Sequence, residues 1–143
     1  MIVAALYQFV EMDEDEAHRI VRDMRDVMNK YDVRGNVRVA REGVNGTISG
    51  DRKGVEKFLD VVKGVKAERR NEVIYKEAVS KTHVYEKAIV KYKEEIVSIG
   101  PDAVKDALPL KRIGTYVKPE DWNERVVHDP DTIILDVRND YEI

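Results

Sequence analysis

The sequence predicts an α+β fold in which residues 1–80 run β-α-β-β-α-β. Four short segments have the composition of strands, because they are either continuously apolar or alternate apolar with polar residues. Two longer segments repeat apolar residues every three to four positions, which is typical of helices packed on one side. This order of elements forms the ferredoxin-like, or split βαβ, arrangement: a four-stranded antiparallel sheet with both helices on one face.

The first predicted strand, IVAALYQFV at 2–10, is apolar on both of its alternating faces. We therefore expect it to lie centrally in the sheet. Its second apolar face should also be covered, either by residues 81–112 or by another domain. After this strand, Asp13 or Asp15 can cap a helix over about 14–29, whose apolar residues recur at three and four.

Four further segments complete the first predicted domain. They are a half-buried strand at 33–40, a hairpin within 41–50, a helix at 51–64 and a strand at 72–79. The hairpin is predicted from the Asn45-Gly46 dipeptide, which tolerates positive φ and favours tight turns, with TIS as the returning strand. The second helix has Asp51 as a capping residue and ends at Gly64.

The segment after the first domain is expected to be an extended connector, residues 81–113. Part of it alternates, with Lys87, Lys91 and Lys93 on one side and apolar residues on the other. We place the domain boundary between about 100 and 114.

Residues 114–143 are expected to begin a second domain. Lys118-Pro119 predicts the start of a helix, with Trp122 as an apolar anchor. The run TIILDVR at 132–138 predicts a strand buried on both faces, as in a parallel sheet. Such a strand needs neighbours that the preceding eleven residues cannot supply, since a parallel pair requires a longer crossover. We therefore expect this domain to be truncated here.

Composition excludes several classes of protein. The chain has 143 residues, enough for one full domain with a modest remainder, and 37% of its residues are charged. Its net charge of −3 argues against bulk attraction to nucleic acid, and it has no cysteine for a disulfide, a thiolate metal site or a nucleophile. The N-terminus lacks the features of a signal peptide, and no apolar run predicts a membrane span. We expect a cytoplasmic protein.

Two patterns could bind a ligand. The loop REGVNG could cradle a phosphate with its backbone amides, although a plain hairpin is the commoner explanation. Basic residues on two predicted strand faces could form a stripe for an RNA backbone if the faces adjoin, although solvated strand faces are again the commoner explanation. These basic residues are Arg34, Arg38, Arg41, Lys87, Lys91 and Lys93. The strands show no aromatic signature of the RRM type.

Other candidate residues give weaker signals. None of His18, His83 and His128 has a second ligand at metal spacing, so we expect surface histidines and no metal site. Asp136 and Arg138 suit either an ion pair at a strand end or a ligand site.

Three stretches of the chain, taken together, resemble a known family. REGVNGTISG, KEEIVSIG and IGTYVKPEDWNERVVHDPDTIILDVRNDYEI resemble, in that order, the rhodanese-related tRNA uridine hydroxylase family. The resemblance implies an N-terminal ferredoxin-like or acylphosphatase-like domain followed by an α/β rhodanese domain, of which this chain would hold only the first helix and strand. It also implies oxygen-dependent hydroxylation at C5 of the wobble uridine of tRNA, so tRNA would be the partner and molecular oxygen a co-substrate.

The same resemblance assigns residues. The family loop is matched by Glu42, Gly43, Asn45, Gly46 and Thr47, and the rhodanese signature by Asp136 and Arg138, as supports of the active-site architecture. Possible tRNA contacts are Arg34, Arg38, Arg41, Lys91 and Lys93. The family cysteine would lie beyond Ile143, so this chain alone should be catalytically inert and bind no cofactor. Arg41 stands where the family commonly has Pro or Ala, and Tyr85 and Glu86 also depart from its pattern.

Two other functions remain open. The protein could be a rhodanese sulfurtransferase whose N-terminal domain serves only in packing or dimerisation. Alternatively, residues 1–80 could be a complete acylphosphatase-like hydrolase. The second alternative is disfavoured because VEMDED, after the first strand, is acidic where that chemistry needs an arginine and glycines around a phosphate.

Overall fold

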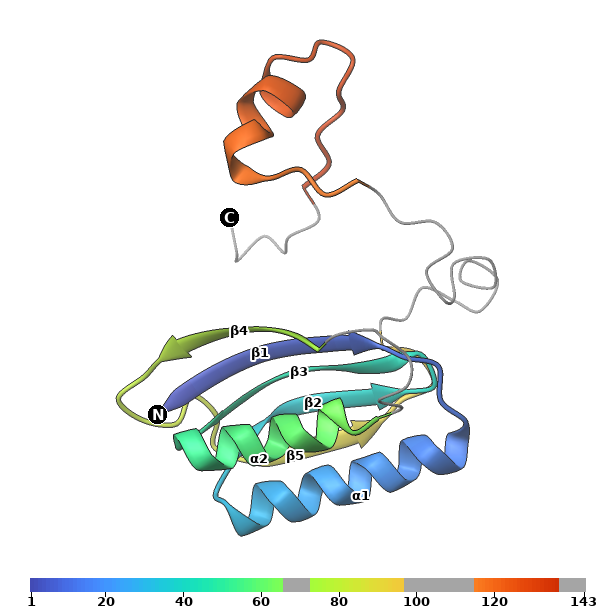
Figure 1. Cartoon of the computed structure of the whole chain (residues 1–143), viewed down its shortest axis with the longest axis vertical. Helices are drawn as coiled ribbons and strands as arrows, with labels where there is room; N and C mark the ends of the chain where they lie inside the picture. The colour runs from blue at the N-terminus through green and yellow to red at the C-terminus, as the bar shows by residue number, and fades with distance from the viewer. Residues whose placement is uncertain (66–72, 97–114, 137–143) are drawn as a thin grey trace. The chain divides into compact units, whose positions relative to one another are not determined.

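The computed structural model describes residues 1–65, 73–96 and 115–136, which belong to two compact units, Met1–Lys111 and Arg112–Ile143. The first unit is a five-stranded sheet with two helices on one face (Figure 1). Its elements are β1 (Ile2–Phe9), α1 (Glu14–Lys30), β2 (Arg34–Ala40), β3 (Gly43–Gly50), α2 (Arg52–Lys63), β4 (Ile74–Val79) and β5 (Ala88–Tyr92). The predicted α+β class and the β-α-β-β-α-β order are confirmed.

The strand order is β4-β1-β3-β2-β5. Strands β1 to β4 pair antiparallel, and β1 is paired on both sides, as predicted. The fifth strand comes from the segment expected to be an extended connector. It is extended, but it pairs in parallel with β2, with Ala88 opposite Gly35. Residues 80–87, here called the crossing segment, connect β4 to β5 across one end of the sheet. At this end Ser80 N donates to Met1 O (2.9 Å) and Gly35 N donates to Lys87 O (2.9 Å).

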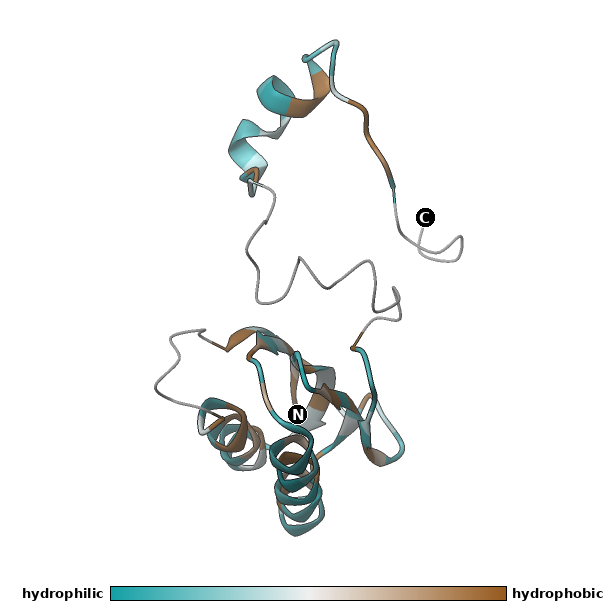
Figure 2. Ribbon diagram, turned by 90° about the vertical axis from the view of Figure 1, so that its right-hand side faces the viewer, coloured by the Kyte–Doolittle hydropathy of each residue, from teal (hydrophilic) through white to brown (hydrophobic). Residues whose placement is uncertain are grey.

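Both helices begin at an aspartate whose carboxylate caps the first turn. Asp13 accepts from Glu16 N at 2.7 Å, and Asp51 accepts from Gly54 N at 2.6 Å. Each helix has an apolar face that packs on the sheet and a polar outer face (Figure 2). Between the two layers lies the core, whose largest fully buried side chains include Leu6, Met24, Met28, Ile48 and Phe58. Arg25 of α1 also fixes β5, because its guanidinium donates to Val90 O at 2.7 and 3.2 Å.

The described residues cover the second face of β1 only in part, and residues 97–112 of the segment expected to cover it lie outside them. Ala4 and Leu6 face the helices and are buried, whereas Tyr7 is 42% and Phe9 37% exposed on the other face. One end of this second face is covered where His83 and Val84 lie against Ser49, and Ile96, which is 5% exposed, lies against Arg38 and Glu42 at the other end. An internal strand thus has apolar residues on both faces, although only its helix-facing residues are fully buried.

The predicted position of the hairpin turn is wrong. The turn is Arg41–Glu42, between Ala40 and Gly43, and Asn45-Gly46 lies inside β3. Gly43 decides this position: its φ is +142°, and a Cβ there would lie 2.0 Å from Gln8 O. Gly46 is needed for space instead, because a Cβ there would lie 2.5 Å from Asn36 O.

The second unit contains two short helical turns. The chain turns at Pro119–Asp121 after Lys118, as predicted, and again at Asn123–Val127. Trp122, the expected anchor, is 45% exposed. The strand expected over 132–138 is not formed by residues 132–136, whose apolar side chains are exposed, because no described strand pairs with them. Arg138 and the rest of that segment lie outside the described residues. No helix among the described residues is long and apolar enough to cross a membrane.

Candidate nucleic-acid interface

The sheet face opposite the helices, here called the open face, carries a row of polar and aromatic side chains that runs across four strands. Tyr7 of β1 is the register partner of Asn45 of β3, Asn45 is the partner of Arg38 of β2, and Arg38 is the partner of Lys91 of β5. Tyr7, Asn45, Arg38 and Lys91 are all exposed. Because neighbouring strands are about 4.8 Å apart, this Tyr7–Lys91 row is about 14 Å long.

The charges of the strand residues on the open face all have one sign. The described strand residues whose side chains point to this face are Val3, Ala5, Tyr7, Phe9, Arg34, Asn36, Arg38, Ala40, Asn45, Thr47, Ser49, Ile74, Lys76, Ala78, Ile89 and Lys91. Arg34, Arg38, Lys76 and Lys91 are basic, and none of these strand residues is acidic. The strand residues thus give this face positive charge in a chain whose net charge is −3, and two carboxylates adjoin it at its ends: Asp32 beside Arg34, and Glu42 bonded to Ile96.

The structure brings some of the predicted RNA-contacting residues together and separates others. Arg38 and Lys91 are adjacent, and Lys93 continues along the same edge, with its N donating to Val39 O at 2.9 Å. Arg34 lies toward the opposite end of β2, where its Nε is 3.1 Å from Asp32 Oδ1. Arg41 lies in the turn at the end of the sheet. Arg38 and Lys91 are thus the best-placed pair of the predicted set.

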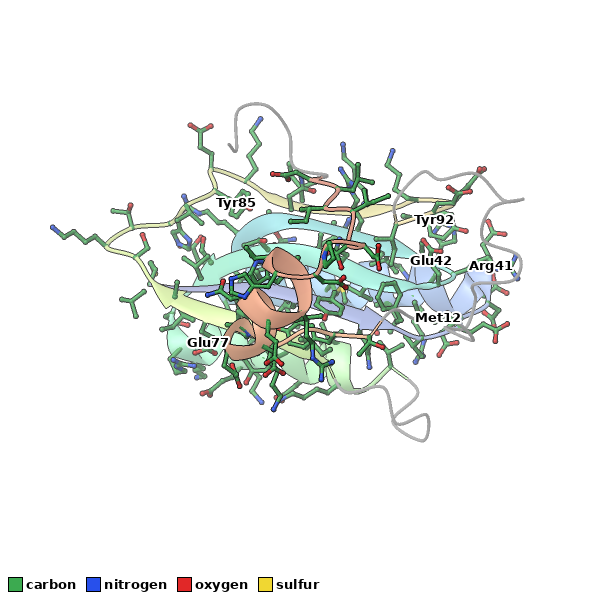
Figure 3. All side chains as sticks on the ribbon, turned by 90° about the horizontal axis from the view of Figure 1, so that it is seen from above. Met12, Arg41, Glu42, Glu77, Tyr85 and Tyr92 are labelled. Carbon is green, nitrogen blue, oxygen red and sulfur yellow. The ribbon has the colours of Figure 1, made fainter. Side chains whose placement is uncertain are left out.

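Glu42, from the family-type loop, holds the backbone of the domain together. Its carboxylate accepts from Ile96 N at 2.5 Å, while Arg38 Nη1 donates to Ile96 O at 3.4 Å. Its carbonyl accepts from Val10 N at 3.1 Å, and Arg41 O accepts from Met12 N at 2.8 Å. Met12, Arg41 and Glu42 accordingly gather at one end of the sheet (Figure 3). The contacts of Glu42 join β1, the turn and the segment after β5.

The other loop residues, Gly43, Asn45, Gly46 and Thr47, lie in β3 between β1 and β2. Strand pairing on both sides uses the backbone amides that an anion cradle would need. The side chains of Asn45 and Thr47 point to the open face, where they are available to a partner. The contribution of this loop to a site thus comes from side chains on a strand.

A serine, a histidine and an aspartate meet at the covered end of the open face. His83 Nδ1 lies 3.1 Å from Ser49 O and 3.2 Å from Ser49 Oγ, and Ser49 Oγ accepts from Val84 N at 3.3 Å. His83 Nε2 is 3.4 Å from Asp32 Oδ2, close enough for charge attraction but outside hydrogen-bond geometry. The side chain of His83 is only 11% exposed, so the expectation of a surface histidine is wrong here, since the crossing segment packs the ring against β3.

This cluster does not make a hydrolytic triad. Ser49 is fully buried, and the carbonyl beside His83 Nδ1 favours a proton on that nitrogen, which then cannot accept one from the serine. Its role is to anchor the crossing segment. The hydrogen bond from Arg34, together with the nearby positive charge, lowers the pKa of Asp32 below its ordinary value of 3.8. Among the described residues, no group of three or more histidines, cysteines and carboxylates could hold a metal ion.

The sequence interpretation missed the aromatic part of the open face. Tyr7 and Phe9 both point to it from β1, and their rings pack edge to face with centroids 5.9 Å apart. The signal was present as two aromatic residues at i and i+2 in a predicted strand. The same pattern also fits a strand buried on both sides, because periodicity alone cannot show whether a face is covered.

The fold defines an acylphosphatase-like domain of the ferredoxin type, but its first loop is not arranged for that hydrolysis. The amides of Val10 and Met12 are bonded to carbonyls of the turn, and the charged side chains of this loop are Glu11 and Asp13. Residues 1–96 match the family model described as the UPF0176 acylphosphatase like domain, and the chain belongs to this family. The match includes β5 and ends at Ile96, the residue held by Glu42 and Arg38.

Proposed function

We propose that this chain is the N-terminal part of a rhodanese-like tRNA-modifying enzyme that hydroxylates C5 of the wobble uridine with molecular oxygen. In this proposal, the sheet domain helps to position tRNA. The family match over residues 1–96 supports it, as do the motifs that resemble the tRNA uridine hydroxylases. The observation that carries the binding role is the adjacency of Arg38 and Lys91 on a face whose charged strand residues are all basic.

In this proposal, the chain's own residues have a binding role and not a catalytic one. Hydroxylation in this proposal relies on a rhodanese-loop cysteine, and none of the 143 residues is a cysteine. A serine could not replace the thiolate, since Ser49, the serine beside a histidine, is buried. Asp136 and Arg138 would support the architecture of the rhodanese part. We expect this chain to bind tRNA without modifying it.

The test is the affinity of the chain for tRNA at low and at physiological salt. Lys91→Glu should weaken binding, because it removes one phosphate contact and adds a repulsive charge. Arg22→Glu is the matched control, since it makes the same change of charge at an exposed position of α1, on the other layer. Equal losses in both variants would mean a general charge effect, and no binding by the unaltered chain at low salt would refute the positioning role.

The reaction itself is tested on the protein that includes the cysteine-bearing domain. Mass spectrometry of nucleosides from tRNA incubated with that protein should show an oxygen-dependent gain of hydroxyl at the wobble uridine. Transfer of sulfur from thiosulfate to cyanide with no change in the tRNA would instead indicate the sulfurtransferase.

A further inference from the structure

The most exposed aromatic side chain of the sheet lies in line with its cationic pair. Tyr7 is 42% exposed in the interior strand β1, and it shares the Tyr7–Lys91 row with Asn45, Arg38 and Lys91. Phe9, two residues further along, is 37% exposed and contacts the edge of the Tyr7 ring. Two neighbouring aromatic rings left exposed to solvent lose the free energy that their burial would contribute. Such exposed apolar surface is typical of an interaction site.

The order of chemical groups along the row fits a nucleotide strand. An aromatic ring can stack on a base, the amide of Asn45 can donate to and accept from a base edge, and the two cations can contact phosphates. Thr47, a residue of β3 on the same face, adds a hydroxyl. The geometry points to Tyr7 as a stacking platform for an unpaired RNA base, with Arg38 and Lys91 contacting the phosphates of the same strand.

This inference rests on the proposed function and narrows it, because it commits the open face to unpaired nucleotides. A duplex hides the faces of its bases, so stacking on Tyr7 requires a loop or a single strand. The alternative occupant is a protein surface. The charges favour the nucleic acid, since the charged strand residues on this face are basic only, and Asn45 separates the aromatic and cationic ends of the row.

The experiment compares Tyr7→Ala, Tyr7→Phe and the control Tyr75→Ala. Tyr75 is exposed to a similar extent, 39%, but it lies on the helix side of β4, near Lys63. The probes are tRNA, an unstructured oligouridine of about ten nucleotides, a duplex of the same length, and heparin, which carries charge without bases. Thermal unfolding of each variant shows whether the fold is intact.

We expect Tyr7→Ala to weaken binding of oligouridine and tRNA by about tenfold, with little change for heparin. Tyr7→Phe should retain binding, because the ring and not the hydroxyl stacks, and Tyr75→Ala should bind like the unaltered chain. If tRNA binds but Tyr7→Ala changes nothing, the stacking role is refuted and the proposed function stands. If no RNA binds the unaltered chain, the positioning role fails as well.

Two further outcomes would overturn the inference. One is equal loss of heparin and RNA affinity in Tyr7→Ala, which would mean that the substitution disturbs the cationic pair. The other is unchanged RNA affinity together with a marked fall in melting temperature or a change in oligomeric state, which would assign Tyr7 and Phe9 to a protein contact.

Discussion

Arg38 and Lys91 are register partners in a parallel strand pair, so two cations lie side by side on an exposed sheet face. Like charges at facing positions destabilise a sheet unless an anion lies over them. We predict that this arrangement lowers the stability of the free domain and raises its affinity for a polyanion. The two effects have opposite signs, which makes the pair testable without knowledge of the reaction.

We predict that Lys91→Gln raises the free energy of unfolding by a few tenths of a kcal/mol at low salt, because it removes the repulsion from Arg38. The same variant should lower tRNA affinity and reduce the slope of log affinity against log salt concentration by about one. Urea titrations and binding at several salt concentrations measure the two quantities. If stability and affinity both fall, Lys91 is a structural residue and not a phosphate contact.

Gly46→Ala should destabilise the domain by about 1–3 kcal/mol, the range found for overpacked interiors. The added methyl group would lie 2.5 Å from Asn36 O and 2.7 Å from Val37 Cα, both backbone atoms that cannot rotate away. Gly64→Ala is the control, since its nearest atom would be 3.3 Å away at the end of α2. The midpoint of urea unfolding should fall clearly for Gly46→Ala and little for Gly64→Ala. Equal midpoints would contradict the tight contact of β3 with β2.

Glu42→Ala should free the amide of Ile96. The hydrogen bond from this amide to the Glu42 carboxylate is 2.5 Å long, and bonds to charged acceptors contribute about 1.5–3 kcal/mol. Hydrogen exchange at Ile96 should accelerate in Glu42→Ala and less in Glu42→Gln, which keeps an acceptor. If the Ile96 amide exchanges at the same rate in the unaltered chain and in Glu42→Ala, the Glu42 carboxylate does not protect this amide. Arg38 donates to the carbonyl of Ile96, so Glu42→Ala could also displace the Arg38 side chain. A loss of RNA affinity in this variant would therefore not by itself show that Glu42 contacts RNA.

The pair of Asp32 and Arg34 predicts a loss of stability in acid. Because the pKa of Asp32 is lowered on folding, mainly by the hydrogen bond from Arg34, its contribution is fully present above 3.8 and is lost as the pH falls through the folded value. Asp32→Asn removes this titration and suits the φ of 46° at this position. The stability difference between the unaltered chain and Asp32→Asn should shrink from about pH 5 downward. A constant difference between pH 5 and pH 2 would refute the linkage.

Local patterns are sufficient to predict the first four strands and both helices in their order along the chain, the capping residue Asp51, and Asp13 as one of two candidate caps. They failed where the outcome depends on contacts distant in sequence. The turn was placed at Asn45-Gly46 because that dipeptide is a strong local signal, but the approach of Gly43 to Gln8 decided it. The parallel pairing of β5 and the exposure of Tyr7 depend on the crossing segment and on what lies over the sheet, which no short window contains.

In the candidate site, too, the sequence predicts the individual residues but not their arrangement in space. The cations were predicted one by one, and their alternation along each strand was predicted correctly. Their arrangement in one row required the register of β3 with β2 and of β2 with β5. With the turn at Asn45-Gly46, Asn45 would have been a loop residue and could not have faced Arg38.

In the two-residue turn Arg41–Glu42, the number of residues is more tightly constrained by the fold than their identity. Most surface hairpins tolerate insertions. Here, one extra residue between Ala40 and Gly43 would slide β2 along β3, turn Arg38 inward and place Val37 or Val39 in water. Arg41 contributes its backbone carbonyl to Met12 N, so its side chain can be replaced, whereas a longer loop would require a compensating bulge in β2 to keep the same residues on the open face.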